Sequence, residues 1–141
     1  MPTTIDDLTR LMEYMRGKNG CPWDRAQDMD DFLVHLKNES DEVLAAIKKK
    51  DYENLREELG DLLWNIIFIS QLAKEKKKFD FAGVMDDIRK KIIRRHPHVF
   101  GNAKASTPEE VIKHYQRIKR QEKLMLPHNR PQVKQDNKRK K

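Results

Sequence analysis

Residues 53–73 read ENLREELGDLLWNIIFISQLA, and this stretch decides the fold of the chain. Its apolar residues recur every three or four positions, which is the spacing of one face of an α-helix. The spacing predicts a long helix from about Glu53 to Lys77. Its core stripe consists of Leu55, Leu59, Leu62, Ile66, Ile69 and Ala73, widened by Leu63 and Ile67. So broad an apolar surface implies burial against more than one partner helix, and it is compatible with burial against another subunit.

The same stretch carries two acids at helical spacing, and an earlier stretch repeats them. Residues Leu36, Glu39, Glu42, Val43 and Ile47 have the same spacing as Leu55, Glu58, Asp61, Leu62 and Ile66. Each acidic pair lies within one helical turn and on one face. In two neighbouring antiparallel helices, equivalent edges either both line the seam between the helices or both turn away from it. The first arrangement gathers all four carboxylates into one cleft.

Such a cluster of like charges is unfavourable, and a divalent cation would offset its repulsion. Like charges three or four residues apart destabilise a helix by roughly 0.2 to 0.5 kcal/mol per pair. Two pairs that meet across a seam repel each other further. Mg²⁺ suits the cluster because it takes oxygen ligands, keeps some water and is often completed by substrate phosphates. Solvated surface acids are the alternative for any single residue, but the repeated pair beside two apolar stripes favours a metal site.

Composition indicates one helical domain. The chain has 141 residues, of which 38% are charged, 37% are hydrophobic and only five are glycine, and this balance fits a helical protein better than a sheet protein. No apolar run approaches the length of a membrane span, and residues 1–20 lack the order of a signal peptide. We therefore expect a cytoplasmic protein. The single cysteine, Cys21, cannot form an internal disulfide, which is compatible with a reducing compartment.

The net charge of +7 is concentrated at the end of the chain. Residues 127–141 contain six Lys or Arg and one acid, which gives +5 and leaves +2 for the other 126 residues. We therefore predict a folded domain over residues 1–126 and a basic, disordered tail over residues 127–141. The tail could contact RNA or polyphosphate, but a solvated charge run is the preferred interpretation.

The remaining segments predict further helices and no strand. Helices are expected over about Ile5 to Arg16, from near Asp28–Asp31 to the lysines 48–50, over Ala82 to Arg95, and from Thr107 to about Leu126. The segment Gly20-Cys-Pro-Trp-Asp24 is expected to be a loop. The predicted fold is an all-α protein with a four-helix-bundle core and an additional C-terminal helix, assembled as an oligomer.

Three other features suggest a nucleotide ligand. Trp23 is either a lid on the core or a ring that stacks on a base. Lys91 and Arg95 lie one turn apart and could clamp a polyphosphate, although a helix C-terminus also attracts positive charge. Tyr115 and Lys119 present an aromatic ring and a cation one turn apart on the last helix, which alone is a weak signal.

Together these segments closely resemble the MazG family of nucleoside triphosphate pyrophosphohydrolases, from about Leu8 to Lys123. The resemblance is carried by Gly20-Cys-Pro-Trp-Asp24 with Gln27, the pair Glu39 and Glu42, Glu57-Glu58-Leu-Gly-Asp61-Leu-Leu63, Arg94-Arg-His-Pro-His-Val-Phe-Gly101, and Ile118-Lys119 before Glu122-Lys123. An acidic pair alone would not identify a family. Five segments in the family's order make the resemblance specific.

The resemblance implies hydrolysis of a nucleoside triphosphate to the monophosphate and pyrophosphate, with Mg²⁺ required and Mn²⁺ as a substitute. It implies that Glu39, Glu42, Glu58 and Asp61 are catalytic metal ligands. It further implies that Lys91, Arg95 and Lys119 hold phosphate charge, and that Trp23 and Tyr115 lie near the nucleotide. Related enzymes pair subunits through their bundles, so a homodimer is expected first and a tetramer second.

Three positions depart from the family pattern, and two other functions compete. Asn38 stands where an acid is common, Tyr115 where tryptophan is usual, and Asp28 where threonine is common. These departures concern substrate preference more than metal binding.

One alternative is a specialised pyrophosphohydrolase for dUTP, dCTP or phosphoribosyl-ATP, although the Arg-Arg-His-Pro-His segment favours MazG. The other is a non-catalytic helical adaptor or RNA-associated protein, which the complete set of four acids disfavours.

Overall fold

The computed structural model describes residues 1–125, and every regular element in them is a helix. The elements are α1 (Ile5–Met15), α2 (Pro22–Ala26), α3 (Phe32–Lys49), α4 (Tyr52–Glu75), α5 (Phe81–Arg94), α6 (Pro97–Phe100) and α7 (Pro108–Met125). The all-α prediction is confirmed, while the four-helix arrangement and the oligomeric state stay predictions. The chain divides into two compact units, Met1–Asp86 and the residues from Asp87 onward. Each unit is described by itself.

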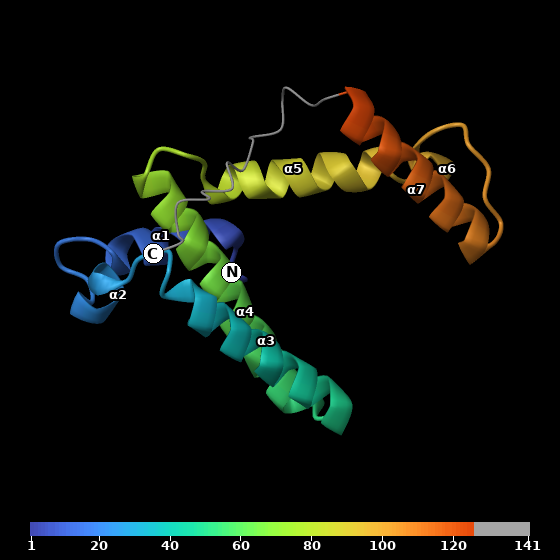
Figure 1. Ribbon diagram of the computed structural model, residues 1–141. Coiled ribbons are helices and arrows are strands. Elements are labelled where there is room, and N and C mark those ends of the chain that lie inside the picture. The colour runs from blue at the N-terminus through green and yellow to red at the C-terminus, as the bar shows by residue number, and fades with distance from the viewer. Residues whose placement is uncertain (126–141) are drawn as a thin grey trace, which may run out of the picture. The chain divides into compact units, whose positions relative to one another are not determined.

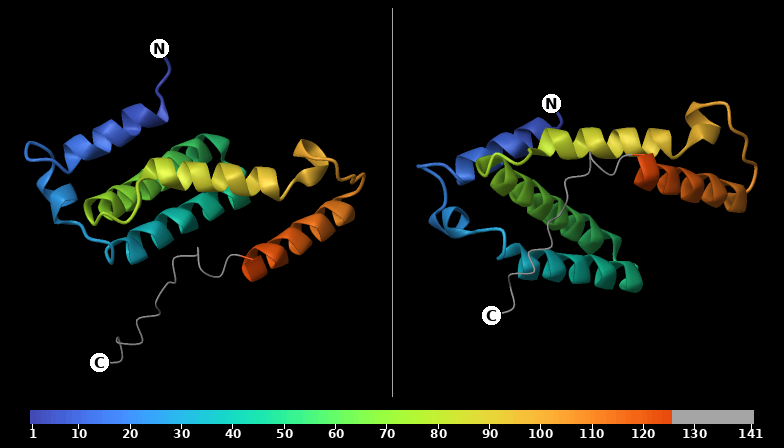
Figure 2. Two further views of the ribbon diagram at one scale, coloured as in Figure 1. Left: turned by 90° about the horizontal axis from the view of Figure 1, so that it is seen from above. Right: turned by 45° about the horizontal axis from the view of Figure 1, so that its top comes forward.

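The first unit is organised around α3 and α4, which run side by side in opposite directions (Figure 1). The turn between them is very short. Lys50 ends α3 in the left-handed conformation, with φ 54°. Asp51 then caps α4, because its Oδ1 accepts a hydrogen bond from the Asn54 amide at 3.2 Å. Figure 2 shows this turn from two further directions. So short a connection leaves the two helices as antiparallel neighbours.

The hydrophobic core of the first unit lies where α1 packs on the second half of α4. It consists of Met12, Phe32, Ile67, Phe68 and Leu72, with Phe32 and Phe68 at 4.6 Å between ring centroids. The predicted α4 stripe was partly wrong, because Leu59 and Ile66 remain 49% and 37% exposed. Because α1 packs on one face of the second half of α4, Leu59 in the first half and Ile66 on another face remain partly in solvent.

Arg16 joins the end of α1 to two other segments of this unit. Its guanidinium makes two hydrogen bonds to the Glu75 carboxylate, at 2.6 and 3.1 Å. It also donates to the carbonyl oxygens of Asp24 and Gln27. One side chain therefore holds the segment that carries Trp23 against the end of α4.

The prediction that the segment 20–24 is a loop was partly wrong, because α2 begins within it at Pro22. Proline suits the first turn of a helix, since its fixed φ is helical and no amide hydrogen is needed there. Gly20 makes the tight approach to α1 that precedes this turn. A Cβ on Gly20 would lie 2.2 Å from the Met15 carbonyl oxygen and 2.3 Å from that of Tyr14. No side chain fits at this position.

In the second unit, α7 begins as the sequence predicts. Thr107 precedes Pro108, and the Glu110 amide donates to the Thr107 hydroxyl at 3.3 Å. The side chains of Arg94 and Arg95 pair with Glu122 of α7. The predicted basic tail and the predicted end of α7 at Leu126 lie outside the described residues. Within residues 1–125, no helix is both long and apolar enough to cross a membrane.

Gly20 and Gly60 provide a matched pair of stability variants. Gly20→Ala is expected to lower the free energy of unfolding by about 1 to 3 kcal/mol, because the added Cβ overlaps two backbone carbonyl groups. Gly60→Ala is the control: it lies within α4 with open space around it and should raise stability by about 0.5 to 1 kcal/mol. Urea denaturation measures both, and equal effects would contradict the assigned close approach.

Candidate active site

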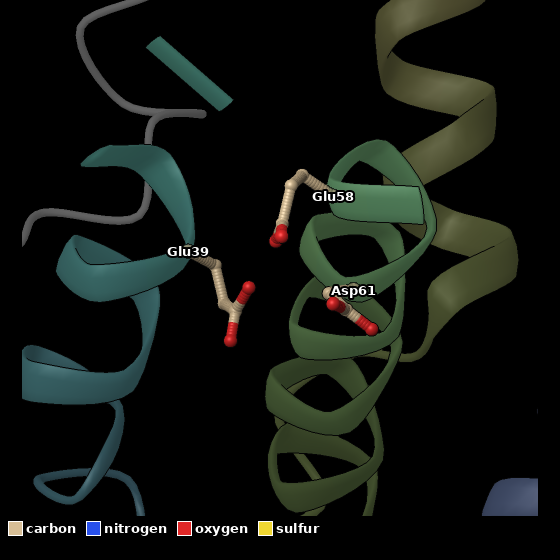
Figure 3. A group of neighbouring side chains, drawn as sticks. All are labelled: Glu39, Glu58 and Asp61. Carbon is tan, nitrogen blue, oxygen red and sulfur yellow. The ribbon is translucent and has the colours of Figure 1, made fainter. Parts of the chain in front are cut away.

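Three of the four predicted metal ligands meet across the seam between α3 and α4. Glu39 extends from α3, and Glu58 and Asp61 extend from successive turns of α4 (Figure 3). Each contributes a carboxylate oxygen, and these oxygens all lie within 4.8 Å of one another. The equivalent acidic edges therefore line the seam. This is the first of the two arrangements that the sequence left open.

Glu42, the fourth predicted ligand, is exposed on α3 and lies outside this group of three. It nevertheless contacts the cluster, because its carboxyl group forms a hydrogen bond with that of Glu58. This bond and burial, together with the charges of the neighbouring acids, raise the pKa of Glu58 to about 7. The folded protein therefore disfavours the charged form of Glu58.

Two carboxylate oxygens in the cluster have no partner. Oε2 of Glu39 and Oε2 of Glu58 are both buried without a hydrogen bond. Burial, followed by the charges of Glu42 and Asp61, raises the pKa of Glu39. Buried acceptors are normally satisfied, so this cluster lacks positive charge. Mg²⁺ takes oxygen ligands and is commonly held by carboxylates together with water and substrate phosphates, and the residues therefore fit a divalent cation.

An aromatic pocket adjoins the cluster through Glu39. Its cavity of about 130 Å³ is lined by Trp23, Phe32, His35, Glu39, Trp64, Asn65 and Phe68. Trp23 is 56% exposed, and its ring lies 5.5 Å from that of His35. The sequence analysis missed His35 and Asn65. Helical spacing could have found them, since His35 is one turn before Glu39 and Asn65 one turn after Asp61.

In the second unit, Arg95 and Tyr115 come together, but Arg95 is engaged internally. Arg95 is 6% exposed, and it donates to Glu122 Oε2 at 2.8 Å and to the Tyr115 hydroxyl at 2.7 Å. Its guanidinium also lies 4.8 Å from the centre of the Tyr115 ring. Hydrogen bonds from Arg95 hold the pKa of Glu122 down at about 2. Glu122, two turns after Tyr115, was not predicted as its partner.

The other predicted cations are exposed. Lys91 lies in the last turn of α5. Lys119 lies on α7, where it lines a shallow hollow with Gln116, Arg120 and Lys123. These residues belong to the second unit, whereas Trp23 and the carboxylates belong to the first. Their predicted contact with phosphate stays a prediction.

Comparison with known proteins identifies the family. The model of the MazG nucleotide pyrophosphohydrolase domain matches residues 27–100, which is more than half of the chain. The chain belongs to the MazG family. The matched range contains all four acids together with Lys91 and Arg95, so the resemblance seen in the motifs is confirmed.

Individual relatives support the assignment of the chain to the MazG family. The nucleoside triphosphate pyrophosphohydrolase of Escherichia coli K12 is 41% identical over 120 residues, covering 84% of this chain and 46% of that protein. The nucleoside triphosphate pyrophosphohydrolase/pyrophosphatase MazG of Thermotoga maritima is 38% identical over 119 residues, covering 84% and 45%. The crystal structure of a mazG-related protein from Thermotoga maritima superposes with a TM-score of 0.69 and 28% identity, covering 82% of this chain and 99% of that one. The chain spans about half the length of the two curated relatives.

Glu58 is expected to make the stability of the metal-free protein depend on pH. Its pKa is raised from the ordinary 4.5 to about 7, so the folded state disfavours the charged form. The free energy of unfolding should therefore fall as the pH rises from 4.5 to about 7 and then level off.

Thermal melts of the wild type and Glu58→Gln, run in chelator at about pH 5 and about pH 8, isolate this contribution. Glu58→Gln carries no charge at either pH, so its advantage over the wild type should be much larger at the higher pH. An advantage of the same size at both values would contradict the assigned pKa.

Proposed function

We propose that the protein hydrolyses nucleoside or deoxynucleoside triphosphates to the monophosphate and pyrophosphate, with Mg²⁺ as its cofactor and Mn²⁺ as a substitute. The observation that supports this most directly is the cluster of Glu39, Glu58 and Asp61, in which two buried oxygens lack partners, within a chain of the MazG family. The E. coli and T. maritima relatives carry the activity in their names. Control or cleaning of a nucleotide pool is the proposed biological purpose.

In this reaction the carboxylates would hold the cation and accept the proton of the attacking water. Glu39, Glu58 and Asp61 would hold the cation, with Glu42 beside Glu58. When bound, Mg²⁺ neutralises phosphate charge. Water attacks the α-phosphorus, and the bond from that phosphorus to the oxygen of the departing pyrophosphate breaks. The proton that water loses passes to a carboxylate of the cluster, which also orients the water.

The two competing functions are less well supported. A specialised enzyme for dUTP, dCTP or phosphoribosyl-ATP would use the same cluster and differ only in the groups around the base and sugar. A helical adaptor would gain nothing from buried, unpartnered carboxylate oxygens, which destabilise the fold. The cytoplasmic location stays a prediction from the sequence.

We also propose that the chain forms a homodimer through α3 and α4, with a tetramer as the second choice. Large apolar side chains on these two helices remain in solvent, among them Leu33, Leu44, Ile47, Leu59 and Ile66. A second copy would cover such a surface by one self-complementary contact. Ile67, which widens the predicted apolar stripe of α4, is 1% exposed in the core and therefore cannot lie in the interface.

Asp61→Asn is expected to reduce Mg²⁺-dependent release of pyrophosphate by at least about a hundredfold, because it removes a charge from the cation site. A panel of triphosphates with Mg²⁺, with Mn²⁺ and with chelator measures this. The matched control is Asp41→Asn, since Asp41 is an exposed acid of α3 that pairs with Lys37 at 2.7 Å. The control should retain activity, and both variants should melt close to the wild type. Equal activity of the two variants would rule out the cluster as the site.

The double variant Leu59→Ser/Ile66→Ser is expected to raise the dimer dissociation constant by at least about a hundredfold, because each subunit loses two apolar contacts. Sedimentation velocity across micromolar concentrations measures this. Leu11→Ser is the control, since Leu11 on α1 and Leu59 are both 49% exposed. A wild-type protein that sediments as a monomer and still hydrolyses triphosphates would overturn the proposed assembly.

A further inference from the structure

Arg16 does more than form an ion pair with Glu75. Its side chain is 11% exposed, and its Nη1 donates to the carbonyl oxygens of Asp24 and Gln27, the second at 3.1 Å. Asp24 lies in α2, and Gln27 follows its last residue. The guanidinium also lies over the Phe68 ring, 5.6 Å from its centroid. The last carbonyl groups of a helix lack full partners within it, and a cation there suits the helix dipole. Arg16 therefore fixes the C-terminal end of α2.

The helix α2 depends on such hydrogen bonds, because it has little packing of its own. Of its five residues only Asp24 is buried, and Trp23 is 56% exposed. A helix this short is not stable alone in water. Hydrogen bonds from a charged donor are roughly twice as strong as those between neutral groups. The bonds from Arg16 are therefore a main determinant of where Trp23 lies.

The Gln27 side chain connects α2 to α3. Its Nε2 donates to the Trp23 carbonyl oxygen at 3.2 Å, and its Oε1 forms a hydrogen bond with His35 Nε2 at 3.0 Å. The rings of Trp23 and His35 lie 5.5 Å apart, and both line the cavity that includes Glu39. A shift of α2 would therefore move Trp23 away from this cavity.

We propose that Arg16 is a positioning residue for substrate binding, which holds Trp23 at the cavity beside the cation cluster before the nucleotide arrives. The inference rests on the proposed function, since Glu39 belongs to both the cavity and the cluster. A segment that is in its binding position for only a fraction of the time lowers the apparent affinity by that fraction. Loss of the Arg16 bonds should therefore raise KM and leave kcat nearly unchanged. A purely structural role would instead unfold part of the enzyme, which lowers the measured kcat and leaves KM unchanged.

Steady-state kinetics of the full-length protein, with the best substrate of the triphosphate panel, test this role. Arg16→Lys keeps a positive charge opposite Glu75 and removes the planar fork that serves the carboxylate and both carbonyl groups at once. It should raise KM by about tenfold and change kcat by less than about twofold. Glu75→Gln is the matched control, because it removes the same ion pair and keeps the fork. Lys74→Met is a second control, since Lys74 pairs with Glu13 and so also joins α1 to α4. Both controls should keep the wild-type KM.

Fluorescence of Trp23 separates this inference from the proposed reaction. The chain has two tryptophans, so Trp23 alone emits in a Trp64→Phe background. Time-resolved anisotropy without substrate should show a more mobile Trp23 in Arg16→Lys and an unchanged one in Glu75→Gln. If Arg16→Lys does not fold, the double variant Arg16→Met/Glu75→Met replaces it, because it leaves no unpaired charge.

Greater mobility of Trp23 without Arg16 would support the inference even if the wild type hydrolysed no triphosphate. An unchanged Trp23 anisotropy would overturn it. A fall in kcat at unchanged KM would also overturn it, since that result belongs to a purely structural role.

Discussion

The antiparallel pairing of α3 and α4 is the constraint on which the candidate site depends. The turn at Lys50 and Asp51 keeps the two helices as antiparallel neighbours, and the equivalent acidic edges of the two line the seam between them. Glu39 meets Glu58 and Asp61 there. The apolar residues beside these acids hold the helices together, while the acids repel. Packing therefore supplies the free energy that keeps like charges close, which is the condition for strong cation binding.

Two arginines, the half-buried Arg16 in the first unit and the buried Arg95 in the second, each join separate segments of their own unit. Arg16 links α1, the Trp23 segment and α4. Arg95 links the end of α5 to Glu122 and Tyr115 of α7. Breaking either pair would leave a buried or half-buried charge without compensation, and this is far more costly than losing an exposed ion pair. Both arginines thus connect structural elements. The sequence had predicted a role only for Arg95, as a phosphate-binding residue, and none for Arg16.

The sequence predicted what depends on local spacing and missed what depends on distant partners. Apolar periodicity predicted the long helices and their order, and the repeated acids predicted the cluster. The same periodicity could not choose the buried face of α4, because its apolar residues surround most of the helix and only packing with α1 selects Ile67 and Phe68 over Leu59 and Ile66. Glu122 lies 27 residues after Arg95, so no local pattern pairs them.

The departures from the MazG pattern have local structural reasons in two of three cases. Tyr115 accepts a hydrogen bond from Arg95 through its hydroxyl, whereas a tryptophan at this position could donate but not accept. Asp28 accepts from the Asp30 amide at 3.0 Å and the Asp31 amide at 3.3 Å, an arrangement that starts the chain toward α3. Asn38 is exposed and explained by no contact in the described residues. None of these residues belongs to the group of Glu39, Glu58 and Asp61, so the three departures leave the acidic cluster unchanged.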